Sequence, residues 1–478
     1  MTNSSRRCAS FGGRTMLSRR TLLIGLSVLG LAGCATDRPY LAPGFPFLPG
    51  YGRAQDVPPV LLSNTAWWQG LDDPVLDRLI TLALTDSLSL SVARERVTEA
   101  RAARGTVPGA AVLSPSATAR VSGTGNSGPV VQETLQLGLA WMLDPYGARR
   151  QELRAADARI DMSEAEVDAA RLLVLFNMAN AYTDLRYRQR LLSLARAELD
   201  SRQQTLALTR RLAEAESATR LDIVRSEARV AEIHAGLPDQ EAAVTAKLNE
   251  IAVLAGTAPG TLPADLMAAL THGPQPRPRL SPQVGIPADL LRNRPDIRIA
   301  ERRYYAAVAQ IGVAEASQYP SLSLTGTISL DALNGGARSV GYFFGPLLQF
   351  PSLPLDGAQA QVEIRHAQAR QEHEAWKSTV LTAVLEVENA LVEYQAVTAG
   401  TQSSAQAARL YREALDLTRD VFQRGEATLG DLIDAQEAVA GADRTLAGMA
   451  LRHAQSFIAL NVRLGAGNAA DTGVGTSP

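Results

Sequence analysis

The chain has 478 residues, of which 46% are hydrophobic but only 5% aromatic, and this length suits one large core or several domains. Ala and Leu supply most of the apolar content, a balance that favours long helices over a compact, aromatic-rich core. The formal net charge is −2, and Lys247 and Lys377 are the only lysines. No basic stripe points to a nucleic-acid partner.

The first 33 residues are predicted to form an export leader. They contain five arginines and no acidic residue, and residues 21–32 form a 12-residue apolar run. Such a run is too short to span a bilayer but has the length of a signal-peptide core. Arg19 and Arg20 resemble a twin-arginine signal, although an ordinary basic segment is favoured, and Met16 is an alternative start.

The leader ends in Leu31-Ala32-Gly33-Cys34, which resembles a bacterial lipobox. In such a motif small residues admit the peptidase, and the thiol of Cys34 takes a diacylglycerol. The alternative is a plain secretory leader with an incidental cysteine. Ala35 rather than Asp follows Cys34, which favours the outer membrane over retention at the inner one. Since Cys8 lies within the leader, the mature protein is expected to have no thiol for a disulfide or a metal site.

Residues 34–66 are rich in Pro, Gly and aromatic residues and are predicted to form an extended, lipid-anchored tether on the protein surface. From about residue 67 the pattern predicts a helix, two short strands, a long helix, a turn and a second long helix. The same order begins again near residue 287. The sequence therefore predicts two structural repeats, over residues 67–272 and 273–465, and a flexible tail over residues 466–478.

Two stretches show the duplication most directly. "AESATRLDIVRSEARV" (215–230) and "GEATLGDLIDAQEAV" (425–439) align with a constant offset of 209 residues. This offset places Thr219 on Thr428 and Asp222 on Asp431. A near-constant offset over such a length indicates an internal duplication rather than a chance similarity.

The predicted strands are amphipathic. "TLQLGLAW" (134–141) and "LSLTGTISL" (322–330) alternate apolar with polar residues, and residues 116–122 and 339–346 are weaker partners. Strands of about 8 to 11 residues cross a bilayer when tilted. Four strands cannot close a barrel, so other subunits would have to pair the open edges, and a trimer would supply twelve strands. A small soluble sheet capping a helical domain is the alternative. We place Trp141, Tyr342 and Phe344 at a membrane interface.

The predicted helices are long. Residues 148–214 contain no proline or glycine, and 67 residues of helix would measure about 100 Å. An apolar residue recurs there at every seventh position, as in the seam of a coiled coil: Met178, Leu185, Leu192, Leu199 and Leu206. A second proline-free run covers residues 355–464. Helices of this length suit a protein that reaches across a space.

Enzyme signatures are missing from the sequence. It contains no GxSxG, no HExxH and no phosphate-binding glycine loop. His366 and His373 lie seven residues apart on one predicted helical face, where a solvated face is favoured over a metal site. We therefore expect no enzymatic activity, no catalytic residue, no metal and no cofactor.

Four segments carry a resemblance to a known family: "WWQGLDDPVLDRLITLAL" (67–84), "RNRPDIRIAERR" (292–303), "QYPSLSLTGTISL" (318–330) and "GPLLQFPSLPLDGAQAQ" (345–361). With the lipobox, they resemble the outer-membrane factors of tripartite efflux pumps, the TolC-like and OprM-like lipoproteins. The resemblance implies a mainly α chain with membrane β-strands. It implies a homotrimer that forms a twelve-stranded β-barrel in the outer membrane, continued by an α-helical coiled-coil tunnel into the periplasm. The implied partners are outer-membrane lipid, a periplasmic adaptor and an inner-membrane pump of the resistance-nodulation-division type.

The resemblance also implies a periplasmic gate made by two helix-turn-helix tips in each subunit. In the second repeat, Phe422, Gly425, Thr428, Asp431 and Asp434 match the motif of the tip. Asp431 and Asp434 would face the pore and form two acidic rings that disfavour anions. Crowded carboxylates repel one another, so their pKa values are expected to be raised. Without the resemblance, capping of a helix N-terminus is the favoured role for such aspartates.

The first repeat departs from this motif. Thr219, Leu221 and Asp222 match the tip, but Glu216 stands where glycine is expected. This tip is assigned to packing or adaptor contacts. We expect the protein to be the passive exit duct of an efflux or export pump, in the outer membrane and extending into the periplasm. The alternatives are a lipid-anchored periplasmic coiled-coil scaffold without a pore, and a lipoprotein hydrolase for which no nucleophile is visible.

Overall fold

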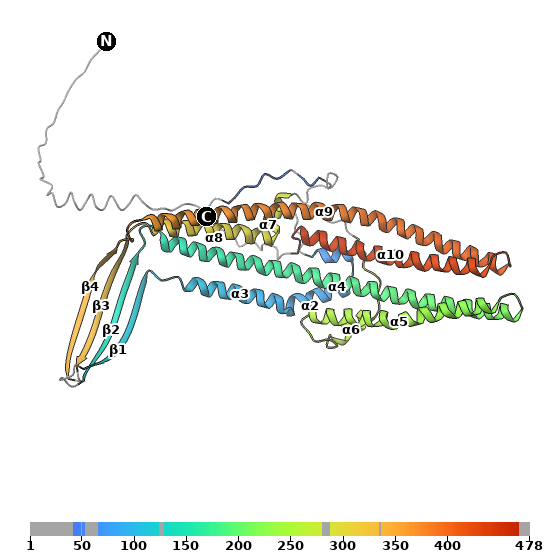
Figure 1. The fold of residues 1–478 in the computed structure, drawn as a ribbon, viewed down its shortest axis with the longest axis horizontal. Helices are drawn as coiled ribbons and strands as arrows, with labels where there is room; N and C mark the ends of the chain where they lie inside the picture. The colour runs from blue at the N-terminus through green and yellow to red at the C-terminus, as the bar shows by residue number, and fades with distance from the viewer. Residues whose placement is uncertain are drawn as a thin grey trace, which may run out of the picture. The chain divides into compact units, whose positions relative to one another are not determined.

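The computed structural model describes residues 42–48, 50–52, 66–123, 129–279, 287–333 and 336–467. The predicted leader, Cys34 and most of the predicted C-terminal tail lie outside the described residues. The elements follow one another in this order (Figure 1): η1 (Trp67–Leu71), α2 (Pro74–Asp86), α3 (Leu88–Gly105), β1 (Ala111–Ser122), β2 (Val130–Leu143), α4 (Ala148–Glu214), α5 (Arg220–Leu254), α6 (Ala264–Thr271), η2 (Pro287–Asp289), α7 (Leu290–Asn293), α8 (Pro295–Ala316), β3 (Ser321–Leu333), β4 (Ala337–Gln349), α9 (Asp356–Gln423) and α10 (Leu429–Arg463).

The chain divides into two compact units, and each draws on both halves of the sequence. The first contains Arg104–Ala156 and Tyr305–Ala369, and it holds the β-sheet. The second contains Ala42–Ala103, Asp157–Tyr304 and the chain from Arg370 onward, and it is helical. The expected fold class, mainly α with a separate β-sheet, is confirmed.

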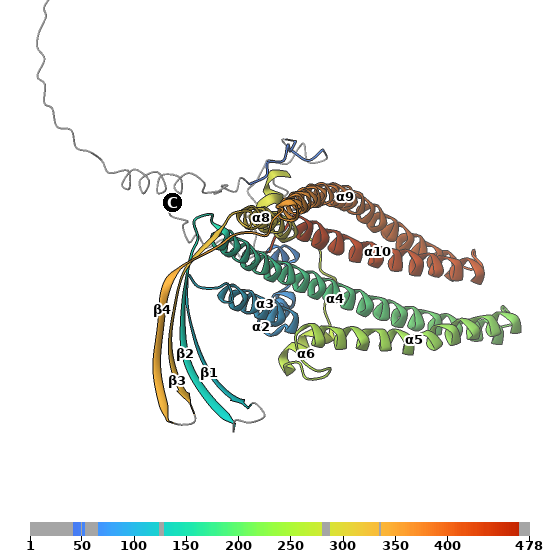
Figure 2. The same cartoon turned by 60° about the vertical axis from the view of Figure 1, so that its left-hand side comes forward.

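The sheet is four-stranded and antiparallel, in the order β1-β2-β3-β4 (Figure 2). All four predicted strands are present, but they contain 12, 14, 13 and 13 residues, more than the 8 to 11 expected. The backbone ladder continues beyond the alternating core of each strand, because pairing needs backbone groups and not a particular side-chain pattern. The central β2–β3 pair joins the two halves of the chain.

The register gives the sheet one apolar and one polar face. Leu135 lies opposite Leu330 and Leu137 opposite Ile328, whereas Thr134 lies opposite Asp331. Thr134 donates a hydrogen bond of 2.6 Å to the Asp331 carboxylate. Because side chains alternate along a strand, this register also places the predicted interface residues on the apolar face: Trp141, Tyr342 and Phe344.

The long helices form two hairpins. Helix α4 covers Ala148–Glu214, as the sequence predicts. In both views α5 runs back along α4, and α10 runs back along α9 (Figures 1 and 2). Helices α5 and α10 each contain 35 residues, in keeping with a duplicated hairpin. Within the described part of the chain, no helix combines the length and apolarity needed to cross a membrane.

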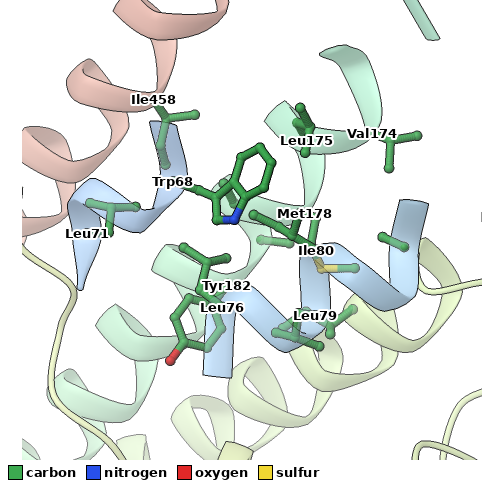
Figure 3. Close-up of a cluster of buried hydrophobic side chains, with 14 of the residues drawn as sticks. Trp68, Leu71, Leu76, Leu79, Ile80, Val174, Leu175, Met178, Tyr182 and Ile458 are labelled. Atoms are coloured by element: carbon green, nitrogen blue, oxygen red, sulfur yellow. The ribbon is translucent and has the colours of Figure 1, made fainter. Parts of the chain in front are cut away.

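The main apolar core of the helical unit lies where η1 and α2 pack between α4 and α10 (Figure 3). Trp67, Leu76 and Leu175 are fully or almost fully buried there. At its border the buried Arg186 guanidinium donates hydrogen bonds to the carbonyl oxygens of Ala269 and Leu270, at the end of α6. A cation at a helix C-terminus is stabilised by the helix dipole, so Arg186 is satisfied there without a carboxylate.

The described part of the tether is attached to α9. Phe45 packs edge-on against Trp376, with ring centroids 6.1 Å apart. Tyr51 is 2% exposed, and the Gly52 N–H donates a hydrogen bond of 2.6 Å to the Glu388 carboxylate. The segment therefore contributes buried side chains to a second apolar cluster instead of lying wholly on the surface.

Equivalent glycines end the two returning helices. Gly256 and Gly465, 209 residues apart, have φ angles of +76° and +77°. Each closes its helix with the same pair of backbone hydrogen bonds, as in a Schellman motif. A Cβ atom on Gly256 would overlap the carbonyl oxygen of Asp86, and one on Gly465 would overlap that of Asn293. The two helix ends therefore share a backbone geometry that only glycine allows at these positions, in keeping with the predicted duplication.

Candidate functional site at the two hairpin ends

The first hairpin end joins α4 to α5 through a left-handed residue that is not glycine. Glu216 has a φ of +60°. Its N–H donates to the Ala213 carbonyl oxygen at 3.0 Å, and the Ser217 N–H donates to that of Leu212 at 2.7 Å. These are the two hydrogen bonds of a Schellman motif. The missing glycine therefore changes the strain of this turn and not its geometry.

A capping box begins α5. The Thr219 hydroxyl accepts the Asp222 N–H at 3.3 Å, and the Asp222 carboxylate accepts the Thr219 N–H at 3.0 Å. Two backbone donors that the helix leaves unpaired are satisfied in this way. Leu221, in the first turn, is 55% exposed.

The second hairpin end has the same geometry 209 residues later. Gly425, with a φ of +74°, takes the place of Glu216, and its N–H donates to the Phe422 carbonyl oxygen at 2.9 Å. The Thr428 hydroxyl accepts the Asp431 N–H at 3.2 Å, and the Asp431 carboxylate accepts the Thr428 N–H at 2.8 Å. The capping interpretation of Asp222 and Asp431 is therefore confirmed.

The caps set the electrostatics of both ends. Hydrogen bonds from the Thr428 side chain and backbone lower the pKa of the Asp431 carboxyl, and those of Thr219 lower the pKa of Asp222. In the single chain the direction is opposite to the raised pKa expected for crowded carboxylates, because donors and not other carboxylates surround these groups. Asp434 is exposed on the following turn of α10 and is not part of the capping box.

The predicted residues fall into two groups. The structure brings Thr219 together with Asp222 on the first hairpin, and Thr428 together with Asp431 on the second. Phe422, in the last turn of α9, is half-buried. In the described residues no three His, Cys, Asp or Glu side chains are grouped so that they could hold a metal ion.

A buried polar network ties the first hairpin to α10. Arg202, Thr205 and Gln436 are 4%, 5% and 8% exposed. The Arg202 guanidinium donates to the Gln436 amide oxygen at 3.2 Å, and the Gln436 amide nitrogen donates to the hydroxyl of Thr205 at 3.0 Å and of Ser201 at 3.2 Å. Arg202 and Thr205 of α4 thus each form a hydrogen bond with Gln436 of α10, on the other hairpin.

Charged side chains extend this network to α5. Glu437 of α10 lies 3.5 Å from the Arg202 guanidinium and 3.2 Å from that of Arg229 in α5. Arg444 of α10 pairs with Glu198 of α4. We call Arg202, Thr205 and Gln436, with these ion pairs, the inter-hairpin network. It links the helix that carries Asp431 and Asp434 to the other hairpin.

The heptad pattern does not predict this network. Leu199 and Leu206, the expected seam residues, are only half-buried, whereas the polar residues Arg202 and Thr209 are buried. These two, with the buried Ala195, also recur every seven residues. That second seven-residue series is the signal in the sequence that could have revealed the network.

The comparisons with known proteins agree with this architecture. The family model described as outer membrane efflux protein matches residues 79–257 and 286–466. Nodulation protein T of Rhizobium leguminosarum bv. trifolii is 33% identical over 453 residues, which cover 91% of this chain and 95% of that protein. The solved outer-membrane channel OprN is 27% identical, with a TM-score of 0.81 over 91% of this chain and 99% of the channel. The chain belongs to the outer membrane efflux protein family.

Proposed function

We propose that this protein is the exit duct of a tripartite efflux or export pump, a passive outer-membrane channel gated at its periplasmic end. The observation that carries the proposal is the sheet, which has an apolar face, a polar face and two open edges, β1 and β4. A bilayer offers no water to unpaired backbone groups, so a membrane sheet needs both edges paired. Pairing β4 of one copy with β1 of the next closes a barrel of twelve strands from three copies.

The exposed side chains support placing this sheet in lipid. Leu330, Tyr342 and Phe344, on the apolar face, are 48%, 80% and 60% exposed in the single chain. Exposure of so many large apolar side chains to water is unfavourable, but lipid removes the penalty. In a homotrimeric barrel the backbone groups of the edge strands are paired by neighbouring copies, and lipid covers the apolar face.

The proposed gate consists of Asp431 and Asp434, one turn apart on α10. Asp431 is ionised at neutral pH and, because its pKa is lowered, stays so in more acidic solution than a free aspartate, while its capping box fixes the direction of the carboxylate. Three copies around one axis would give a ring of negative charge that favours cations over anions. The inter-hairpin network would then restrain the helix that carries the ring.

The proposed partners are a periplasmic adaptor and an inner-membrane pump of the resistance-nodulation-division type. The adaptor would contact the two hairpin ends, where Leu221 offers an exposed apolar side chain and the caps fix the backbone. The other residues proposed for these contacts are Thr219, Asp222, Phe422, Gly425 and Thr428. Cys34 is the proposed site of lipidation, and the tether segment attached to α9 would hold this anchor to the protein.

The gate is tested by single-channel recording of the Asp434→Asn variant in planar bilayers. Asp434 takes no part in the cap, so its neutralisation is expected to lower cation selectivity without unfolding the start of α10. For the variant Asp431→Asn, which does break a cap, Asp222→Asn is the matched control, because it breaks the same kind of cap on the other hairpin. Unchanged conductance and selectivity in the double variant Asp431→Asn with Asp434→Asn would contradict the gate.

The channel itself is tested by removing the lipid. A Cys34→Ala variant that reaches the outer membrane is expected to stay there after carbonate extraction, since a barrel is held by its sheet. Release of that variant into the soluble fraction would support a lipid-anchored scaffold instead.

A further inference from the structure

The polar face of the sheet is divided along its length. Side chains that share this face form cross-strand rows, because directly opposite residues point the same way. Toward the β3–β4 turn, two neighbouring rows contain only small or polar residues: Gly341, Ser329, Gln136 and Ser116 in one, and Ser339, Asp331, Thr134 and Thr118 in the next. The last row before the turn adds one large apolar residue, Leu333, opposite Gln132.

Nearer the helices, the rows on the same face contain large apolar residues. Phe343 lies opposite Thr327, Leu347 opposite Ser323, Met142 opposite Ser323 from the other side, and Val112 opposite Ala140. Their exposed fractions are 58%, 50%, 40% and 37%. We call Val112, Met142, Phe343 and Leu347 the apolar band.

Two adjacent phenylalanines show that the alternation is real. The Phe344 ring covers Gly326 on the apolar face, where a Cβ atom would overlap it. The Phe343 ring lies along its own strand over Gly345 on the polar face, 3.3 Å from where a Cβ atom would be. A glycine thus makes room for each ring, so the two rings are fixed on opposite faces.

We propose that the apolar band is a weak binding site for the apolar or aromatic portion of the transported molecule. This inference rests on the proposed function, in which the polar face lines the water-filled interior. The other face already supplies the contacts with lipid, so the band is not needed for them. A cargo with one apolar and one polar part could contact the band and the Asp331 rows together.

Contacts with the apolar band are expected to be weak, as a channel that must release its cargo requires. Aromatic and apolar contacts of this kind change a dissociation constant by about two- to tenfold. A site in a channel must be weak enough to release what it binds. The band would therefore favour amphipathic cargo over fully polar molecules of equal size without retaining it.

The position of Phe343 is tested by cysteine accessibility in the full-length, reconstituted protein. Phe343→Cys is expected to react with a membrane-impermeant, positively charged methanethiosulfonate and to lower the single-channel current. Phe344→Cys, one residue away on the other face, is the matched control and should leave the current unchanged. The unsubstituted protein shows whether any other thiol reacts. If the Phe343→Cys current does not respond to the reagent, Phe343 does not face the interior and the inference is overturned.

Binding is tested with indole, an uncharged aromatic probe. Indole is expected to reduce the wild-type current, and Phe343→Ser and Leu347→Ser should each require about two- to tenfold more indole for the same reduction. Phe344→Leu, which removes a ring from the lipid face, should behave as wild type. Equal indole sensitivity in all these variants overturns the inference while leaving the channel intact. A wild-type protein that conducts no ions would instead refute the proposed function.

Discussion

The left-handed Glu216 gives a prediction that can be worked out from backbone geometry. An L-residue other than glycine in this conformation costs about 1–2 kcal/mol. Replacement by glycine removes that strain but adds about 0.4–1 kcal/mol of conformational entropy to the unfolded chain. Because the Glu216 side chain is exposed and its turn keeps the same two hydrogen bonds, no packing is lost. Glu216→Gly should therefore stabilise the first hairpin end by about 0.5–1 kcal/mol.

Hydrogen exchange measured by mass spectrometry, on a peptide that covers residues 208–224, reports the local opening of this turn. In Glu216→Gly the exchange of the amides near Ser217 should slow by about two- to fivefold. The matched control is Gly425→Ala on the second hairpin, where a Cβ atom would meet nothing within 4 Å. That substitution is expected to cost about 1 kcal/mol through backbone strain alone and to speed exchange around Glu426.

Two outcomes would refute this reasoning. One is faster exchange in Glu216→Gly, which would mean that the glutamate side chain stabilises the turn by contacts outside the single chain. The other is an unchanged rate in Gly425→Ala, which would mean that the left-handed geometry carries no cost at this hairpin.

Three further predictions concern the helical unit. Gln436→Leu removes the amide oxygen that accepts a hydrogen bond from the buried Arg202 guanidinium and should lower the free energy of unfolding by about 1–3 kcal/mol. Glu437→Gln, at a half-exposed ion pair with the same guanidinium, should cost less than about 1 kcal/mol, and denaturant titration compares the two variants. Asp431→Asn should lower the melting temperature at neutral pH. The Asp431 pKa is lowered from 3.8 in the folded protein. The difference in melting temperature between the variant and the unsubstituted protein should therefore be complete above pH 3.8 and should disappear as the pH falls through the pKa of Asp431 in the folded state. Gly256→Ala, which combines positive φ with overlap of a backbone carbonyl, should cost about 2–5 kcal/mol in the same titration and far exceed Gly425→Ala.

Local patterns were sufficient to predict the elements of this fold. The absence of proline and glycine over residues 148–214 predicts α4 to the residue, and period-2 alternation predicts the apolar and polar faces that the register confirms. Both signals are local, because helix breaking and strand alternation depend on a few neighbouring residues. The capping interpretation of Asp222 and Asp431 is local for the same reason, since each caps a residue only three positions away.

Contacts between distant segments were not predictable in this way. The heptad leucines marked the wrong seam near the hairpin ends, because burial of Arg202 depends on Gln436, which lies 234 residues further along the chain. The direction of the Asp431 pKa shift also required the coordinates, which show that Thr428 donors surround the carboxylate.

The sequence by itself determined the long helices, the amphipathic strands and the capping aspartates, since each is encoded by spacing within a short window, and it predicts the duplication from a constant offset. The structure also shows Glu216 in the glycine conformation, closed by the hydrogen bonds of its own turn. Only the tertiary structure decided that a polar network joins the hairpins and that Thr327 and Gly326 lie opposite Phe343 and Phe344. These features depend on which distant backbone pairs with which. Patterns within a short window of the sequence do not reveal that long-range pairing.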